Sequence, residues 1–430
     1  MKRILVSFLI FTLCLGLTAC GKTELPAGPE PPAESQPHIP EDPTEPEGSV
    51  QPETPAPPQF SDEEILQARR DAAVAYARSI CHIRWRSDTE VSYVASSGAG
   101  SPYQIVAGRL YEGLPYSFAG ASVAAWLDHP GSVDDRGVFN MTGLNRELLN
   151  GNSTAARIGI DCSGTVERSW QSFGSKIRSE STNGMTVDKG FVKVGEYEAA
   201  KSTYADTRED CNQNGKEVML AAYALLQPAD AVVTYAGTGH AMLVVGVDVV
   251  RDESGAVDGL RSKITVIEQN GLLRTGSKYF DPEAGEDVYR CMTEDATYTF
   301  NQLFATGYLP ITCKELVDPA PIQEPKLVDN VKKPSKTNLF SGIIGCTQAL
   351  DNVTVTITDK TGAVVQSSLC HPSRRSSFAF DMTQFIEDSA DQLVGEVALK
   401  ELPAGDYHCT LTVRTVSGHT LTARDFDFTV

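Results

Sequence analysis

Two proline-rich stretches limit what this chain can fold into, because they divide it into separate parts. Residues 21–58 contain twelve of the 24 prolines, with eight acidic residues and a single lysine. Such a segment cannot bury enough apolar surface to offset its ordering entropy, so residues 21–60 are predicted to form an extended tether. A second linker is predicted over residues 316–337, which hold four prolines. Folded structure is therefore expected in two blocks, residues 61–315 and 338–430.

The first twenty residues have the layout of an export signal. Lys2 and Arg3 precede an apolar run over residues 4–17, and residues 17–20 read Leu-Thr-Ala-Cys. This layout is typical of a cleaved signal peptide rather than of a spanning helix. Leu-x-Ala-Cys resembles the bacterial lipobox, which implies export, a lipid on the Cys20 thiol, and anchoring as a lipoprotein to the outer face of the cell membrane. The alternative is an ordinary secretory signal followed by an unrelated cysteine.

The charge balance excludes one class of partner. The chain carries 37 basic and 56 acidic residues, a formal net charge of −19. Proteins that bind nucleic acid neutralise phosphates with clustered Lys and Arg, which such a balance does not offer. We therefore expect no nucleic-acid partner.

The cysteines leave the disulfide pattern open. Eight of the ten lie beyond the signal and Cys20. If Cys162 is a free nucleophile, seven remain, so at least one more thiol stays unpaired. Metal-ligand spacing is absent, and no metal is expected. Candidate pairs are Cys346 with Cys370 or Cys409, and Cys291 with Cys313.

The first folded block has a mixed α and β pattern that begins with a helix. Ser61 and Glu64 form a Ser-x-x-Glu capping box, which predicts a helix start at Ser61. An apolar stripe is expected along that helix, made of Ile65, Ala72, Tyr76 and Ile80. A further helix is predicted to follow Cys162, because Val166, Trp170 and Phe173 recur at the spacing of one buried face.

Cys162 is the candidate nucleophile of this block. A thiol attacks a carbonyl as its thiolate, which a helix N-terminus or a nearby imidazole stabilises. Ser163 and Gly164 are small, so a substrate carbonyl can approach the backbone amides of the first helical turn. The alternative is a buried structural cysteine in an amphipathic helix.

His240 is the candidate base, and its partner follows from strand register. Strand-like runs cover residues 231–235, 241–250 and 264–267, and a turn-rich segment around Gly255 separates the last two. In a hairpin centred there, positions that sum to about 510 face each other. Strand parity then puts Glu268 and Asn270 on the face of His240, so one of them is expected to orient the imidazole. A slip of one residue would promote Gln269 instead, and a structural core histidine is the alternative for His240.

The second folded block is predicted to be all-β. Short strand-like runs cover residues 353–358, 363–368, 377–381, 408–415 and 420–430, with turn residues between them. This spacing predicts a β-sandwich of about 95 residues. Segment 402–407 (Leu-Pro-Ala-Gly-Asp-Tyr) resembles the approach to a late strand in bacterial immunoglobulin-like modules.

Three segments together resemble the NlpC-type papain-like cysteine hydrolases. They are Gly-x-Asp-Cys-Ser-Gly at 159–164, Leu-Gln-Pro-x-Asp at 226–230, and Gly-His-Ala at 239–241. The resemblance spans roughly residues 103–275 and implies an α+β, papain-like fold with Cys162 as nucleophile and His240 as base. It also implies substrate binding by Tyr116, within Gly-x-Pro-Tyr at 113–116, and by Asp161 and Ser163.

The chain departs from that family in three places. Ala229 replaces the usual glycine between Pro228 and Asp230, and about forty residues are inserted between Tyr116 and Cys162. The third catalytic position is commonly a second histidine in NlpC-type enzymes. Residues 266–270 (Val-Ile-Glu-Gln-Asn) are instead similar to CHAP amidase/peptidase domains, where a Glu and a nearby Asn assist the histidine.

The function implied by this resemblance is hydrolysis of peptidoglycan without a cofactor. The enzyme would be an endopeptidase on stem peptides or an N-acetylmuramoyl-L-alanine amidase, with Cys162, His240, Glu268 and Asn270 as catalytic residues. One alternative is a papain-like hydrolase acting on another amide. Another is a surface-binding or adhesion lipoprotein whose hydrolase domain is inactive. Oligomeric state is left open.

Overall fold

The structure is a computed structural model, and it shows a mixed α+β protein. Its contacts divide the chain into Met1–Pro58 and Gln59–Val430. The export signal, the expected lipid on Cys20 and the tether up to residue 59 lie outside the residues that the structure describes. The described residues are 60–94, 102–150, 158–177, 181–185, 189–199, 206–236, 238–329, 339–372, 377–382, 392–393 and 399–430.

The first helix begins at the predicted capping box. In α1 (Asp62–His82), the Ser61 hydroxyl accepts a hydrogen bond from the Glu64 amide at 3.3 Å, and the Glu64 carboxylate accepts one from the Ser61 amide at 2.8 Å. Two amides at the helix start are satisfied reciprocally. The sequence prediction of this helix start is confirmed.

The buried face of α1 differs from the predicted apolar stripe. Ala72 is exposed, whereas Arg69 and Arg70 are buried. Arg69 donates to backbone carbonyls within residues 315–320 at 2.6–2.7 Å, and Arg70 forms an ion pair with Asp230 at 2.8 Å. Hydrogen bonds of this kind compensate for burying a guanidinium group. They also tie α1 to the turn at residues 228–230 and to the end of the first folded block.

A six-stranded antiparallel sheet forms the centre of the first block, in the order β13-β10-β9-β8-β14-β7. The three predicted strand runs are present as β8, β9 and β10, and the other three strands were not predicted. The bounds are β7 Phe191–Lys193, β8 Ala231–Ala236, β9 Thr238–Asp248, β10 Lys263–Glu268, β13 Thr293–Thr299 and β14 Leu309–Cys313.

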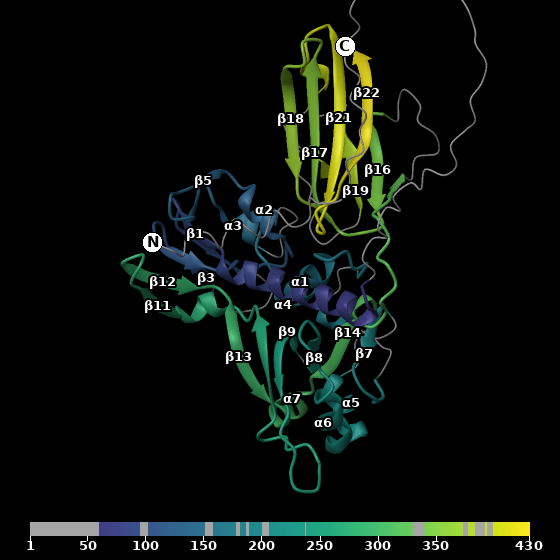
Figure 1. Cartoon of the computed structure of the whole chain (residues 1–430). Helices are drawn as coiled ribbons and strands as arrows, with labels where there is room; N and C mark the ends of the chain where they lie inside the picture. Colours follow the sequence, from purple (N-terminus) through teal and green to yellow (C-terminus); the bar gives the residue numbers. More distant parts are fainter. Residues whose placement is uncertain are drawn as a thin grey trace, which may run out of the picture. The chain divides into compact units, whose positions relative to one another are not determined.

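Helix α4 (Cys162–Gln171) contacts both α1 and β9, and Figure 1 labels it next to α1, above β9. All ten of its residues are buried, so the expected single buried face is wrong. The reason is that several segments pack around α4: it contacts α1 and β9, and Arg168 donates to the carbonyls of Gly120 and Leu350. The helix that carries Cys162 is therefore enclosed and rigidly placed.

A second six-stranded sheet, in the order β11-β12-β4-β1-β6-β5, mixes parallel and antiparallel pairs. The segment between Tyr116 and Cys162 supplies its edge, because β5 and β6 come from that segment. Beside it lies a two-stranded pair, β2 with β3. The bounds are β1 Arg84–Ser87, β2 Val91–Tyr93, β3 Tyr103–Ile105, β4 Leu110–Glu112, β5 Gly131–Val133, β6 Phe139–Met141, β11 Lys278–Asp281 and β12 Glu286–Arg290.

Short helices complete the first block. Helix α5 contacts β8, and α6 contacts α7. Among the described residues, none of the helices is both long and apolar enough to cross a membrane. The bounds are α2 Val123–Leu127, α3 Arg146–Leu149, α5 Thr207–Asn214, α6 Lys216–Tyr223, α7 Phe300–Thr306, and the 3₁₀ turns η1 Thr182–Gly184, η2 Leu272–Thr275 and η3 Lys314–Leu316. A further 3₁₀ turn, η4 Leu399–Glu401, belongs to the C-terminal block.

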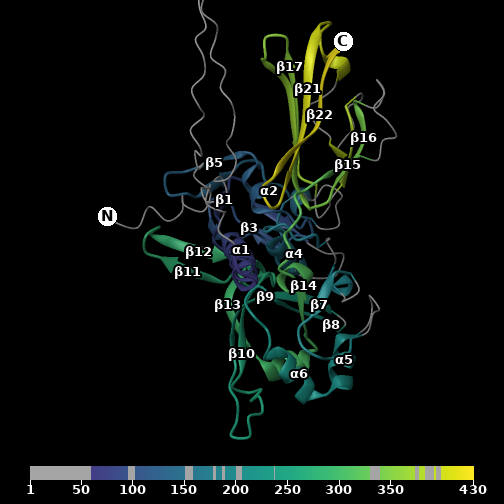
Figure 2. The ribbon, with the colours of Figure 1, turned by 45° about the vertical axis from the view of Figure 1, so that its right-hand side comes forward.

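The C-terminal block consists of two four-stranded sheets, β15-β16-β19-β20 and β18-β17-β21-β22 (Figure 2). Buried side chains from both sheets share one apolar cluster, among them Ile344, Val355 and Leu411. The five strand runs predicted for this block are all present. The bounds are β15 Leu327–Asp329, β16 Ser341–Cys346, β17 Leu350–Asp359, β18 Val364–Cys370, β19 Ser377–Asp381, β20 Gln392–Leu393, β21 Asp406–Thr415 and β22 Thr420–Thr429.

The cysteines beyond residue 20 are all free thiols, and all are buried. The candidate disulfides of Cys346 with Cys370 or Cys409, and of Cys291 with Cys313, are therefore wrong. Burial raises the pKa of Cys211 to about 11, and it raises that of Cys409 to about 12. Thiols whose pKa is raised in this way, such as Cys211 and Cys409, stay protonated and unreactive at neutral pH.

Candidate active site

Cys162 is the first residue of α4, and its neighbour Asp161 caps the helix. The Asp161 carboxylate accepts a hydrogen bond from the Gly164 amide at 2.7 Å, and the Asp161 carbonyl accepts one from Thr165 at 2.9 Å. Such a cap fixes the first turn and leaves the cysteine at the positive end of the helix dipole. The sequence alone did not show this capping role of Asp161.

His240 lies on β9, the strand that α4 packs against, and it is hydrogen-bonded to Cys162. Its Nε2 atom is 2.6 Å from Oε2 of Glu268. Burial by itself lowers the pKa of His240, but the hydrogen bonds to Cys162 and Glu268 outweigh it and raise the pKa to about 10. The imidazole is therefore protonated at neutral pH. A cationic imidazole next to a thiol is the partner that a thiolate requires.

The strand register explains why Glu268 reaches His240. In the β9–β10 pair, Val266 lies opposite Val244 and Ile267 opposite Leu243, so the facing positions sum to 510 at this end. The register predicted from the sequence is confirmed here. An irregularity between Thr265 and Val266 shifts the rest of the pair by one residue.

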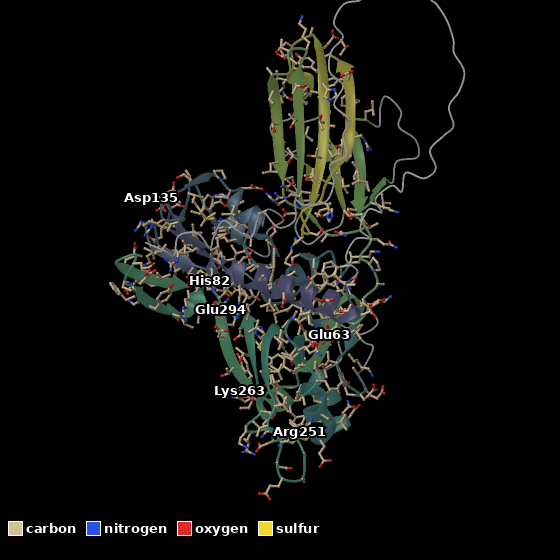
Figure 3. All side chains as sticks on the ribbon, viewed as in Figure 1. Glu63, His82, Asp135, Arg251, Lys263 and Glu294 are labelled. Carbon is tan, nitrogen blue, oxygen red and sulfur yellow. The ribbon has the colours of Figure 1, made fainter. Side chains whose placement is uncertain are left out.

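The two ends of the β10–β13 pair are marked in Figure 3 by Lys263, the first residue of β10, and by Glu294, near the start of β13. Glu268 pairs with Thr293, so the site lies at the Glu294 end. His82, the last residue of α1, is 2.8 Å from Glu294 between Nε2 and Oε2. The end of α1 is thus joined to β13 beside the site.

Glu268 is buried, and both of its carboxylate oxygens are hydrogen-bonded. Its Oε1 atom accepts hydrogen bonds from the Tyr298 hydroxyl at 2.8 Å and from Asn270 at 3.2 Å. Burial alone would raise the pKa of Glu268, but the bonds from His240, Tyr298 and Asn270 hold it below its ordinary range. The carboxylate is therefore ionised and held in one orientation. Asn270, which also donates to Thr293 at 2.9 Å, acts on Glu268 and not on the imidazole.

Tyr298 is the residue of this site that sequence reasoning missed. It lies on β13, which pairs with β10 on the side away from β9. Burial and the neighbouring Glu268 raise the pKa of Tyr298, so it remains a protonated donor. A hairpin argument covers only two strands. The alternation of β13 would have pointed to Tyr298 only after the Ile264–Tyr298 pairing was known.

The predicted substrate-binding residues are arranged close to the start of α4. Tyr116 pairs in a parallel bridge with Ile160, two positions before Cys162. Its ring stacks on Tyr103, with centroids 5.7 Å apart and planes inclined by 7°. Ser163 is buried, with its hydroxyl 3.3 Å from the Asp161 carboxylate. Substrate binding by Tyr116, Asp161 and Ser163 remains a prediction.

The arrangement supplies the parts of a thiol-based acyl transfer: a thiol at a helix start, a protonated imidazole, and a buried carboxylate that orients it. Gln269, the alternative orienting residue, points elsewhere and donates to the Leu114 carbonyl at 2.7 Å. Within the described part of the chain, no group of three or more His, Cys, Asp or Glu side chains is arranged to hold a metal ion.

Comparisons with known proteins add little. No family model matches the chain, and no curated protein matches it. Among solved structures, a tetra-tandem repeat in the extending region of a large adhesion protein aligns with a TM-score of 0.18 and 13% identity. That alignment covers 46% of this chain and 40% of the other. A match of this size carries no argument about fold or function.

Proposed function

We propose that this protein is a lipid-anchored peptidoglycan hydrolase that cleaves an amide bond of the stem peptide through a cysteine thiolate. The observation that carries the proposal is the chain of hydrogen bonds from Cys162 through His240 to the buried Glu268. A structural histidine does not need a buried, fully bonded carboxylate on one side and a thiol at a helix start on the other. A nucleophile and its base need both.

The proposed reaction is acyl transfer in two steps. The Cys162 thiolate attacks the amide carbonyl, and the resulting oxyanion is stabilised by backbone amides and the dipole at the start of α4. The C–N bond breaks as His240 donates a proton to the leaving amine. Water then gives a proton to His240 and attacks the thioester, which releases the acid and regenerates the thiolate. Glu268 keeps the imidazole oriented throughout.

The finer fold assignment belongs to the same proposal. We infer a papain-like domain of the NlpC or CHAP type, in which a helix that begins at the cysteine packs on an antiparallel sheet that carries the histidine. The packing of α4 on β9, and the chain order from α4 to β8, β9 and β10, support it. For the C-terminal block, the two sheets around one apolar core support an immunoglobulin-like module.

The proposed location follows from the sequence signals at the start of the chain. Cleavage before Cys20 and lipidation of its thiol would anchor the protein to the outer face of the cell membrane. At about 3.1 Å per residue in a polyproline II conformation, the tether would reach on the order of 100 Å from the anchor. The domain could then act on peptidoglycan some distance from the bilayer.

The test is solubilisation of purified sacculi by the full-length protein in detergent. We expect turbidity to fall with the wild type and to stay at background with Cys162→Ala. Cys346→Ala, a buried thiol of the C-terminal block, is the matched control and should retain activity. Mass analysis of the released fragments identifies the bond cut. Full activity of Cys162→Ala would refute the proposal.

A further inference from the structure

The turn that follows β10 packs against the ring of Tyr103. After Glu268 the chain passes through Gly271, at φ +75, into the 3₁₀ turn η2. A Cβ atom at Gly271 would lie 2.6 Å from the hydroxyl oxygen of Tyr103, so only glycine allows the turn to come this close. The position of the turn is therefore fixed by Tyr103.

Gln269 stabilises the same turn through hydrogen bonds of its buried side chain. This buried side chain donates to the Leu114 carbonyl at 2.7 Å and accepts from the Gly271 amide at 3.0 Å. Leu114 lies two residues before Tyr116. The Gln269 side chain thus joins the turn after Glu268 to the segment before Tyr116. A buried amide whose hydrogen bonds are all satisfied makes such a connection rigid.

Arg274 is the charged residue that this turn presents. Its guanidinium carbon lies 4.2 Å from the centroid of the Tyr103 ring, and that ring stacks on Tyr116. Burial raises the pKa of Tyr103 to about 12; Arg274 opposes the shift, and the thiol of Cys162 adds to it. Tyr116 in turn forms a bridge with Ile160, two residues before Cys162, so the guanidinium lies on a ring stack that leads to the start of α4.

The charge of Arg274 is available to a ligand. The residue is exposed, and within the described part of the chain no carboxylate forms an ion pair with it. A guanidinium offers a planar set of donors that matches a carboxylate, and stacking on a ring leaves its N–H edge open. The chain as a whole has a net charge of −19 and repels anions. An arginine without an ion-pair partner near the site therefore attracts an anionic group to that one place.

We propose that Arg274, held on the Tyr103–Tyr116 stack, binds a free carboxylate of the substrate peptide near the amide that is cleaved, and so determines specificity for carboxylate-bearing over amidated stem peptides. This inference rests on the proposed function for the identity of the peptide. The contact is made with the bound substrate and takes no part in the bond-breaking steps.

The experiment measures binding separately from turnover. Two synthetic stem peptides, L-Ala–γ-D-Glu–L-Lys–D-Ala, differ only in a free carboxylate or a carboxamide on the α-carbon of the glutamyl residue. Fluorescence polarisation gives their affinities for the full-length protein in detergent, in a Cys162→Ala background that cannot turn them over. We expect the carboxylate peptide to bind about tenfold more tightly, and the ratio to fall to about one on adding Arg274→Gln.

Two further variants complete the set. Arg274→Lys keeps the charge without the planar fork and should keep part of the preference. Arg261→Gln removes another exposed arginine, one paired with Asp258 at the hairpin turn, and should leave the ratio unchanged. The melting temperature should be the same for all, because both arginines are exposed.

The results separate the two proposals. A preference that survives Arg274→Gln, or no binding of either peptide, would overturn the inference. Hydrolysis of the same peptides is measured separately, with proteins that retain Cys162. If the peptides are cleaved but Arg274 makes no difference, the inference fails while the hydrolase proposal stands. If Arg274 decides binding but no peptide or sacculus is cleaved, the binding site stands and the hydrolase proposal fails.

Discussion

The two folded blocks each contain a histidine bonded to carboxylates at almost the same distance. In the first block, His240 lies 2.6 Å from Glu268; in the C-terminal block, His408 lies 2.6 Å from Asp425 and 2.8 Å from Asp427. Both histidines have a raised pKa. Distance and charge alone therefore do not distinguish a candidate catalytic pair from a surface pair.

Burial and the neighbouring thiol make the distinction. The Glu268 side chain is 2% exposed and that of His240 is 24% exposed, whereas His408, Asp425 and Asp427 are 42%, 59% and 90% exposed. Cys409 follows His408 in sequence, but strand alternation turns it into the apolar core of its own block. Burying an ion pair costs desolvation free energy, which a catalytic role beside a thiol would explain, whereas an exposed pair costs little and contributes little to stability.

The largest expected effect separates the two carboxylates. Glu268→Gln removes the charge that orients His240, so hydrolysis should fall by about 10²-fold or more. Asp427→Asn makes the same chemical change in the C-terminal pair and should leave the rate within about twofold, since exposed pairs contribute little. Initial rates of sacculus solubilisation measure both. Equal losses of rate from the two variants would show that the buried and the exposed histidine–carboxylate pairs do not differ in function.

A smaller loss of hydrolytic rate is expected from Tyr298, which bonds to Glu268 and not to the imidazole itself. Tyr298→Phe deletes a donor to the Glu268 carboxylate and keeps the ring, so the rate should fall about tenfold, as for one bond to a charged group. Tyr298 acts through Glu268: its hydrogen bond lowers the pKa of that carboxyl, so its loss makes the carboxylate more basic and a stronger partner for the His240 imidazolium. The alkaline limb of the pH–rate profile, expected near pH 10 in the wild type, should therefore move to higher pH. An unchanged limb together with a lower rate would indicate a structural role only.

The smallest effect is expected at the exposed pair. Because the pKa of His408 is raised above 6.5 in the folded protein, its attraction to Asp427 is present at low pH and lost as the pH rises through that raised value. His408→Ala should lower the melting temperature slightly at pH 5.5, not at all at pH 9, and less at high salt. Its hydrolytic rate should match the wild type. A large, pH-independent loss would show that this pair supports the fold.

Local patterns in the sequence predicted the elements that carry the site. The Ser61–Glu64 box gave the start of α1, and the hairpin argument placed Glu268, rather than Gln269, on the side of His240. Each depends on residues close in sequence or on one turn, where periodicity and parity are sufficient. The β runs of the C-terminal block were predicted for the same reason.

The contacts that were missed come from distant parts of the chain. Arg69 and Arg70 look like solvent-facing residues on a helix, and only the carbonyls near residue 318 and the Asp230 carboxylate explain their burial. Tyr298 reaches Glu268 because β13 pairs with β10, and nothing in either segment specifies that pairing. Sheet order over long separations is decided by the whole fold, which a single sequence does not display.

The central claim is that Cys162 is the nucleophile and the His240 imidazolium its partner, and iodoacetamide alkylation at pH 6 tests it most directly. Mass spectrometry of tryptic peptides gives a rate for each cysteine of the folded full-length protein. We expect Cys162 to react first, and His240→Ala to slow it on the order of 10²-fold, because an unassisted thiol is less than about 1% ionised at pH 6. A Cys162 rate no faster than that of the other buried thiols, or one unchanged by His240→Ala, would contradict the account.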